Sequence, residues 1–226
     1  MKKLVVLTGA GMSAESGINT FRDADGLWEG HDVMQVASPE GFRENPELVL
    51  NFYNERRRQL LSVKPNAAHL ALADLEKKYD VTIITQNVDD LHERSGSTDI
   101  IHLHGELLKS RSIDNDTKFY NCNEDIHLGD LSPNGKQLRP HIVWFGEAVP
   151  LLEKAAEITA TADVLVIIGT SMQVYPAASL INYVKPGIPI YFIDPNPSIH
   201  KSNFNNLEII AEKATVGVSQ LIENYL

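Results

Sequence analysis

The sequence has little cysteine, an excess of acidic over basic residues and no long apolar run. Cys122 is the single cysteine among 226 residues, so no disulfide can form within the chain, which fits a reducing compartment. The formal net charge of −10 disfavours binding to nucleic acid through its phosphates. The apolar run at residues 4–7 is too short for a signal peptide, and no run is long enough for a membrane span. We therefore expect a cytoplasmic protein that binds neither nucleic acid nor a membrane.

The sequence does contain short runs that are apolar throughout, separated by amphipathic stretches. Strand-like runs occupy residues 4–8, 81–85, 100–103, 164–168 and 188–193. Unbroken apolar runs of this kind are typical of parallel strands that are covered on both faces. Helical patterns occupy residues 46–61, 67–79, 151–162 and 216–225. This alternation predicts an α/β fold with a doubly wound, Rossmann-like parallel sheet.

Two segments do not fit the alternation of strand and helix. Residues 23–62 and 107–139 are read as insertions that form a small second unit, with a helical part and a polar ribbon. The whole chain, residues 1–226, is then one domain. Its Rossmann-like core is expected to span approximately residues 1–22, 63–106 and 140–226.

A glycine turn follows the first strand-like run. Gly9 and Gly11 allow a tight turn and a close approach of the backbone to a pyrophosphate. The dinucleotide-binding pattern is met only loosely, because Ala14 stands where a third glycine is usual. The ribose-binding acid expected about 20 residues later is also missing. On these residues alone, a plain strand-to-helix turn stays open as an interpretation.

Five motifs in a fixed order make the sequence resemble a known family. They are GAGMSAESGINTFRDADGLW, TQNVDDLHERSGS, LHGEL, LRPHIVWFGE and GTSMQVYPAA. Together they resemble the sirtuins, which are NAD-dependent protein lysine deacylases, over nearly the whole chain. The resemblance implies that NAD is consumed as a co-substrate and that acylated lysine side chains of proteins are the partners. It implies nicotinamide and 2′-O-acyl-ADP-ribose as products, beside free lysine.

The resemblance also implies roles for individual residues. His104 matches the family's catalytic base, a task that suits a histidine near neutral pH. The implied NAD contacts share positions in the glycine-rich segment or just after a strand-like run: Gly9, Ala10, Gly11, Met12, Ala14, Phe21, Arg22, Trp28, Gln86, Asn87, Asp89, Gly169, Thr170, Ser171, Asp194, Asn196 and Ala214. Asp194 stands where the family usually has asparagine. Its carboxylate can accept from two ribose hydroxyls and repel a 2′-phosphate, which favours NAD over NADP.

Some residues in these motifs also have a simpler structural interpretation. An Asn or Asp after a strand often caps the next helix, and Asp90 fits that role better than Asp89. His102 lies two residues before His104, and the pair could suggest a metal site. Because no other ligand cluster is evident nearby in the sequence, we expect His102 to be a structural, hydrogen-bonded residue.

The substrate side of the site is predicted from two further segments. Tyr53 and Arg56 lie three residues apart on one helix face, and in one sirtuin class a Tyr-x-x-Arg pair recognises acidic acyl groups. A solvated basic face beside Arg57 and Arg58 is the alternative. Val143, Phe145 and Gly146 resemble the edge that pairs with an extended substrate peptide through backbone hydrogen bonds. We expect succinyl- and malonyl-lysine as substrates, with acetyl-lysine also admitted.

The chain departs from most sirtuins at the zinc site. A structural zinc needs four ligands, and the segment 107–139 offers only Cys122 and His127, with Ser112 where a first cysteine is usual. We therefore predict no zinc. Phe119 and Tyr120 are the candidates for the small core that would hold this segment instead.

Three other functions remain as alternatives on the sequence alone. An ADP-ribosyltransferase or an NAD glycohydrolase would break the same bond and use the same pocket. A non-enzymatic NAD-binding module is disfavoured by the presence of His104, Asn87 and Asp89 together. A Rossmann dehydrogenase is disfavoured most, because it needs the missing ribose-binding acid and a hydride-transfer site.

Overall fold

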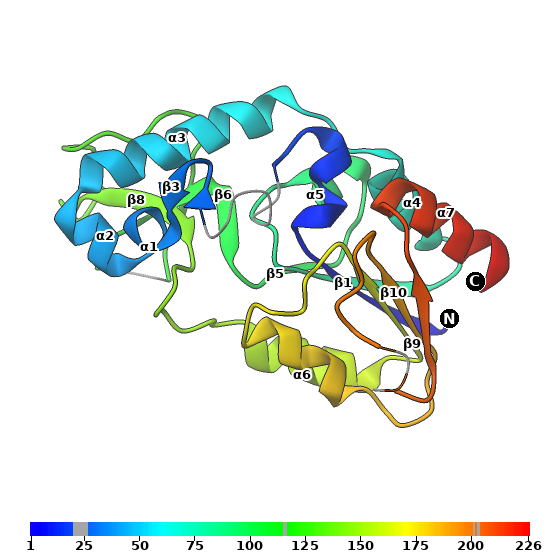
Figure 1. Ribbon diagram of the computed structural model, residues 1–226. Helices are drawn as coiled ribbons and strands as arrows, with labels where there is room; N and C mark the ends of the chain where they lie inside the picture. The colour runs from blue at the N-terminus through cyan, green and yellow to red at the C-terminus, as the bar shows by residue number, and fades with distance from the viewer. Residues whose placement is uncertain (20–26, 115–116, 201, 203) are drawn as a thin grey trace.

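The computed structural model describes residues 1–19, 27–114, 117–200, 202 and 204–226 (Figure 1). The strands are β1 (Lys3–Thr8), β2 (Leu27–Trp28), β3 (His31–Asp32), β4 (Asp80–Thr85), β5 (Ile100–His102), β6 (Gly105–Ser112), β7 (Phe119–Asn121), β8 (Leu138–Ile142), β9 (Val164–Ile168), β10 (Ile190–Ile193) and β11 (Leu207–Ile210). The α-helices are α1 (Val33–Val36), α2 (Pro39–Glu44), α3 (Pro46–Ser62), α4 (Ala67–Leu75), α5 (Leu91–Ser95), α6 (Leu152–Thr161) and α7 (Ala214–Asn224). Short 3₁₀ turns occupy Ala10–Met12, Ala14–Ser16 and Ala177–Tyr183.

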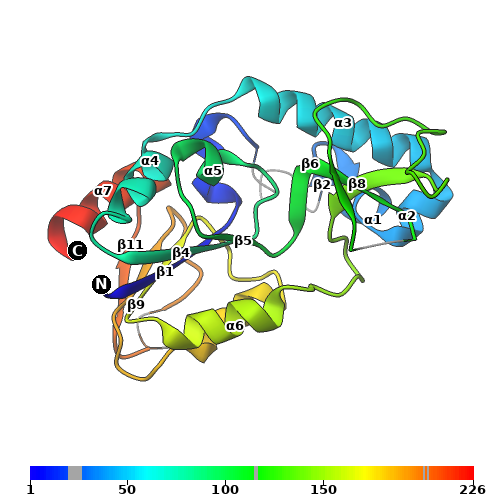
Figure 2. The ribbon, with the colours of Figure 1, turned by 180° about the vertical axis from the view of Figure 1, so that it is seen from behind.

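The main sheet has six parallel strands in the order β11-β10-β9-β1-β4-β5. Alternate side chains of β1 point to opposite faces and are buried on both. Leu4 and Val6 pack with α4 and α7, whereas Val5 and Leu7 pack with α6 and the turn at Ala177–Tyr183. Both ribbon views show α4 and α7 on one side of the sheet and α6 on the other (Figures 1 and 2). Burial on both faces is why these strands are apolar throughout, and the predicted doubly wound fold is confirmed.

A second layer of structure lies beside the sheet. Strands β7, β6 and β8 form a three-stranded antiparallel sheet, and α1, α2 and α3 pack against it around a separate apolar cluster (Figure 2). Helices α2 and α3 begin at Pro39 and Pro46, each after a capping residue, Ser38 or Asn45, whose side chain accepts from a first-turn amide. None of the helices in the described ranges has both the length and the apolar character that a membrane span requires.

The small antiparallel sheet is not held as the sequence suggested. Phe119 is 44 % exposed and lies against His141, so it is not a core residue. Instead Ile126 is buried, and the Asn54 side chain of α3 binds both its N–H and its carbonyl oxygen, each at 2.9 Å. The fully buried Arg57 donates to the carbonyl of Leu107 at 3.2 Å and to Asn54 Oδ1 at 2.7 Å. A polar centre on α3 therefore ties the ribbon to the helices.

The elements match the sequence expectations except at short or polar segments. The five predicted strands occur, with Ile188 and Pro189 lying just before β10. The edge strand β11 was missed, because four residues that include Glu208 resemble a loop. The helical pattern at residues 67–79 overran α4, which ends at Leu75 and is followed by turns.

Candidate active site

The glycine turn after β1 crosses the turn after β9 in direct backbone contact. The N–H of Gly11 donates to the carbonyl of Gly169 at 2.8 Å, and the N–H of Gly9 donates to that of Ile168 at 3.0 Å. A Cβ on Gly11 would lie 2.7 Å from Gly169 Cα, and a Cβ on Gly169 would lie 2.4 Å from the Met12 nitrogen. Gly169 also has a positive φ of 61°. Both turns therefore require glycine at this crossing.

A cavity of about 810 Å³ opens at the carboxyl ends of the main strands and extends to the small sheet. Its lining includes most residues predicted for the site: Gly9, Ala10, Gly11, Ala14, Trp28, Tyr53, Arg56, Gln86, Asn87, Asp89, His104, Val143, Phe145, Gly146, Gly169, Thr170, Ser171, Asp194 and Asn196. Met12 and Ala214 do not line it and are buried in the core instead, while Lys213 does line it. Phe21 and Arg22 lie outside the described residues.

Four consecutive backbone carbonyls, beginning with that of the last residue of β4, accept hydrogen bonds from the segment that carries His104. The N–H of Leu103 donates to the carbonyl of Thr85 at 2.9 Å, and that of Leu107 donates to the carbonyl of Val88 at 2.8 Å. Between them, the ring nitrogens His104 Nδ1 and His102 Nδ1 lie 3.1 Å and 3.2 Å from the carbonyl oxygens of Gln86 and Asn87. Hydrogen bonds from segment 102–107 to each of the four carbonyl oxygens therefore position segment 85–88.

The side chains of this segment form a hydrogen-bond chain with the glycine turn. Asn87 Nδ2 donates to Ser13 Oγ at 3.2 Å, and Ser13 Oγ donates to Asp89 Oδ2 at 2.9 Å. All three side chains are buried, and burial raises the pKa of Asp89 although the bonds from Ser13 and the Leu91 amide lower it. Ser13 was missed in the sequence, where its place inside the glycine turn was the available signal.

The capping expectation for this segment was wrong. Asp90 stands at the N-cap of α5, but its side chain makes no capping bond there. Asp89 Oδ1 instead accepts from the N–H of Leu91 at 3.1 Å. Asp89 thus serves both the helix start and the cavity, because its two carboxylate oxygens point to different donors.

His104 has the geometry and charge state of a general base. Its Nδ1 faces the Gln86 carbonyl, which can only accept, so Nδ1 carries a hydrogen and Nε2 carries the lone pair. Burial lowers the pKa of His104, although the bond to Gln86 partly opposes this. The ring is therefore neutral at pH 7 and lines the cavity with a nitrogen able to take a proton.

The end of the cavity beside the small sheet is aromatic and cationic. Trp144 Nε1 donates to the hydroxyl oxygen of the fully buried Tyr53 at 3.0 Å. Arg56 lies 4.3 Å from the Phe52 ring centroid, its side chain is 16 % exposed, and its Nη2 is 3.2 Å from Glu55. Its Nε and Nη1 are buried without a hydrogen-bond partner. These orphaned donors can bind an anion that enters the cavity.

Glu147 holds the segment that carries Trp144. Its carboxylate accepts from Arg139 at 2.7 Å and from the Trp144 amide at 2.8 Å, and it pairs with Arg111 at 3.3 Å. Burial would raise the pKa of Glu147, but these partners lower it overall. Trp144 and Glu147 were missed as site residues because their motif, VWFGE, was read only for its backbone edge.

That edge has fewer free amides than the sequence suggested. The N–H of Val143 donates to the carbonyl of His104, and the N–H of Phe145 donates to that of Ala37, both at 2.9 Å. A peptide strand at Val143 and Phe145 must therefore use their carbonyl oxygens, since each amide is already bonded within the protein.

The opposite end of the cavity carries groups suited to a ribose. The buried Asp194 follows β10, and its Oδ1 accepts from the N–H of Asn196 at 2.8 Å. Gln86 Nε2 donates to Thr170 Oγ1 at 3.2 Å, which joins the turns after β4 and β9. The carboxylate, amide and hydroxyl groups here match the hydroxyls of a nucleotide sugar.

His102 has neighbours that the sequence did not reveal. Ligand atoms of Glu93, His102 and Glu106 lie within 4.8 Å of one another, so the expectation that no cluster surrounds His102 was wrong. His102 Nε2 is 2.7 Å from Glu93 Oε1, and Lys109 Nζ is 2.7 Å from Glu106 Oε2. Each carboxylate thus already has a nitrogen partner, His102 for Glu93 and Lys109 for Glu106. The expectation of a hydrogen-bonded His102 agrees with these contacts.

The ribbon does not fit a structural zinc ion. Cys122 Sγ donates to the carbonyl of Glu124 at 3.4 Å. In the described ranges, the cluster at His102 is the single group of three or more potential metal ligands, and it does not include Cys122 or His127. The absence of zinc stays a prediction that metal analysis must test.

Comparison with known proteins places the chain in one family. The Sir2 family model matches residues 9–176. "NAD-dependent protein deacylase" of Helicobacter pylori (strain ATCC 700392 / 26695) is 58 % identical over 98 % of this chain and 96 % of its own length. A protein of the same description from Bacteroides thetaiotaomicron (strain VPI-5482) is 54 % identical over 98 % of this chain and 97 % of its own.

Solved structures agree with the sequence relatives. A Sir2 homolog–NAD complex superposes with a TM-score of 0.88 at 40 % identity, covering 98 % of this chain and 88 % of that one. A Sir2 protein bound to acetylated peptide gives a TM-score of 0.80 at 28 % identity, covering 97 % and 92 %. This chain therefore belongs to the Sir2 family.

Proposed function

We propose that this chain, as an NAD-dependent protein deacylase, removes succinyl and malonyl groups from lysine side chains and also accepts acetyl-lysine. When bound, NAD supplies a ribose carbon that becomes electrophilic as nicotinamide leaves. His104 Nε2 takes the proton of a ribose hydroxyl, because its Nδ1 is committed to Gln86. The acyl oxygen would attack the ribose carbon as nicotinamide departs. The deprotonated 2′-hydroxyl would then bond to the acyl carbon, and one water would be consumed as the acyl carbon–nitrogen bond breaks, so that the products are lysine, nicotinamide and 2′-O-acyl-ADP-ribose.

Arg56 is the observation that supports an acidic acyl group. Two of its guanidinium nitrogens, Nε and Nη1, are buried without partners, and the residue lines the same cavity as His104. A buried donor without an acceptor costs about 1–3 kcal/mol, more for a charged group. A carboxylate at the end of the acyl chain would supply a charged acceptor for one of these nitrogens, which a neutral acetyl group cannot do.

Tyr53 supports the same proposal through the direction of its hydrogen bond. An indole N–H can only donate, so Trp144 makes the Tyr53 oxygen an acceptor and leaves the phenolic hydrogen for another partner. Burial raises the pKa of Tyr53, which keeps the phenol protonated. Tyr53 can therefore donate to an acyl carboxylate beside Arg56.

The residues of the cofactor end fit NAD. The two crossing glycine turns let backbone line the cavity without side chains in between, although the N–H groups of Gly9, Gly11 and Gly169 are bonded within the protein. Asp194 and Asn196 line the far end, where an adenosine ribose would need acceptors. The Asn87–Ser13–Asp89 chain provides amide and carboxylate groups near His104, which we propose to hold the nicotinamide ribose.

The test is an assay of matched peptides that differ only in the acyl group. With acetyl-, succinyl- and malonyl-lysine in one peptide sequence, we expect kcat/KM for the acidic groups to exceed that for acetyl. Equal or lower values for the acidic groups would contradict the acyl preference while leaving deacylation intact. Mass measurement of the peptide separates the alternatives, since an ADP-ribosyltransferase adds mass and an NAD glycohydrolase releases nicotinamide without deacylation.

A further inference from the structure

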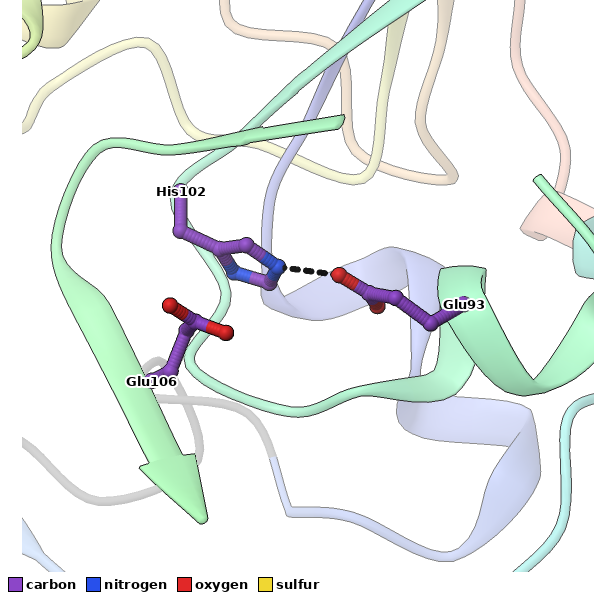
Figure 3. Close-up of side chains that lie close together, drawn as sticks. All are labelled: Glu93, His102 and Glu106. Atoms are coloured by element: carbon purple, nitrogen blue, oxygen red, sulfur yellow. Dashed lines mark hydrogen bonds and ion pairs between the residues drawn. The ribbon is translucent and has the colours of Figure 1, made fainter. Parts of the chain in front are cut away.

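His102 is a buried ring whose two nitrogens both face oxygen atoms that can only accept. Nε2 lies 2.7 Å from a carboxylate oxygen of Glu93, and Nδ1 lies 3.2 Å from the carbonyl oxygen of Asn87. Figure 3 shows the ring between Glu93 and Glu106, with Nε2 directed at Glu93. A neutral imidazole has one N–H and could satisfy only one of these two acceptors. The contacts therefore require the doubly protonated, cationic ring.

The charges around the ring favour the same state. Glu93 of α5 and Glu106 of β6 face His102, and Lys109 of β6 partly compensates Glu106. Asp89 lies close enough to interact electrostatically, and His92 of α5 is neutral at pH 7 because burial lowers its pKa. Burial would lower the pKa of His102, but its bond to Glu93 and the two glutamate charges raise it overall. The pKa of Glu93 is lowered in return by His102, against the effect of burial.

We propose that His102 is a positioning residue: as an imidazolium bridging Glu93 to the carbonyl of Asn87, it holds segment 86–89 in the conformation that receives NAD. The Asn87 carbonyl is one of four that segment 102–107 holds, and the N–H of the same residue donates to Thr85 Oγ1 at 3.0 Å. With its backbone held at both groups, Asn87 directs its side chain to Ser13 and through it to Asp89. A charge-assisted bond at this carbonyl is stronger than a neutral one.

Two histidines in one short motif thus perform opposite tasks. His104 is neutral and lines the cavity, whereas His102 is charged and lies behind it, against Glu93. Both use Nδ1 to hold adjacent carbonyls, those of Gln86 and Asn87. The two rings differ in the partner of Nε2: that of His102 faces the Glu93 carboxylate, whereas that of His104 does not face a carboxylate among the described contacts. The inference concerns the NAD side of the proposed function and does not depend on which acyl group is removed.

The protonation state can be measured without any activity assay. In protein labelled with ¹³C and ¹⁵N at histidine, ring chemical shifts followed against pH report each titration. We expect His102 to titrate above 6.5 and His104 below it, with Glu93→Gln lowering the His102 midpoint more than Glu106→Gln does. A His102 midpoint at or below 6.5 in the wild-type protein would overturn the proposal.

The positioning role predicts a KM effect that depends on pH. In Glu93→Gln, the KM for NAD should approach that of the wild type as the pH falls below the His102 midpoint measured for the variant, because both rings are then charged. At a pH between the two measured midpoints, the KM of the variant should be about 3- to 5-fold above the wild type, with kcat changed less, as expected when a charge-assisted bond becomes neutral. Glu106→Gln, which removes a facing charge but no bond to His102, should stay within about twofold of wild type. A Glu93→Gln defect that is equal at all pH values would mean a merely structural role.

The same spectra can test whether the cluster binds a metal. Zinc needs a neutral ring nitrogen, so a bound ion would replace the proton on Nε2. We expect one equivalent of zinc chloride to leave the His102 titration unchanged. A zinc-dependent loss of that titration would overturn the proposal. Calorimetry of NAD binding would test the proposed function separately.

Discussion

At the scale of single residues, Arg56 provides the sharpest test of substrate choice. If Arg56 binds the acyl carboxylate as proposed, removing its guanidinium should lower kcat/KM for succinyl-lysine by about 10-fold or more. In Arg56→Met, the value for acetyl-lysine should change far less, because acetyl offers no charge to pair.

A matched control for Arg56 lies two residues away on the same helix. The Arg58 side chain is 58 % exposed and pairs with Asp125 outside the cavity. Arg58→Met should therefore leave both activities near wild type. Equal losses of desuccinylation in the two variants would assign the effect to the charge of helix α3 rather than to Arg56.

The charge state of His104 predicts the acidic side of the pH profile. Because burial lowers the pKa of His104 below 6.5, kcat/KM should fall only as the pH drops well below 6.5 and the ring becomes protonated. The base form is then already complete at neutral pH. A rate profile for one peptide between pH 5 and 8 would check this, and a half-maximum above 7 would contradict it.

Residue-level prediction from sequence succeeded where a side chain follows a strand and failed where its partners are distant in the chain. Asn87 and Gln86 could be placed because the carboxyl end of β4 had to meet the glycine turn. The pairing of Trp144 with Tyr53 joins residues 91 positions apart, and no local pattern encodes it. Glu93 was missed as the partner of His102 although it lies nine residues away, because the short helix α5 that carries Glu93 was not predicted.

At the scale of secondary-structure elements, Asn54 has the largest effect on the small sheet. Asn54→Ala would leave the N–H and carbonyl of Ile126 and one donor of Arg57 without their partner. We expect a loss of roughly 2–4 kcal/mol in the free energy of unfolding, from several buried groups left unsatisfied. Denaturant unfolding would measure it, with the exposed Asn51→Ala on the same helix as a near-neutral control.

Metal analysis tests the same ribbon from another side. We predict that purified protein contains well under one zinc per chain, and that a chelator leaves its thermal unfolding unchanged. The reason is that hydrogen bonds from Asn54 and the buried Arg57 already hold the ribbon to α3, as a zinc ion with four ligands would otherwise stabilise it. Near-stoichiometric zinc, or a chelator-dependent loss of stability, would contradict this.

The elements themselves could be predicted where burial imposes a pattern. Strands β1, β4, β9 and β10 are buried on both faces and are largely apolar, so they could be predicted from their sequences. Strand β11 lies at the edge, with Glu208 among its four residues, and lacks that pattern. The core of the ribbon was assigned to Phe119 by hydrophobicity, whereas the structure uses a polar centre on α3, which hydrophobicity cannot reveal.

At the scale of the whole molecule, the cavity joins the six-stranded sheet to the small sheet, so a ligand there should stabilise both. ADP-ribose at about 100 times its Kd should add about 2.7 kcal/mol. For a chain of this size, that corresponds to a rise in Tm of about 5–10 °C. Thermal unfolding with and without ADP-ribose would check this.

NADP is the natural control for that experiment. The Asp194 carboxylate lines the cavity where we propose that the adenosine ribose binds, and it should repel a 2′-phosphate. At equal concentrations, NADP should therefore raise the Tm less than NAD does. An equal rise would remove Asp194 from the discrimination between the two dinucleotides.

The crossing of the turns at Gly11 and Gly169 has a consequence for how this protein can vary. A methyl group at either position meets the backbone of the other turn, so neither can change unless its neighbour retreats. Single substitutions at the two sites should each be severe, and the double substitution should be far from the sum of the two. The effect of a substitution at either position therefore depends on the residue at the other, although the two lie 158 residues apart in the sequence.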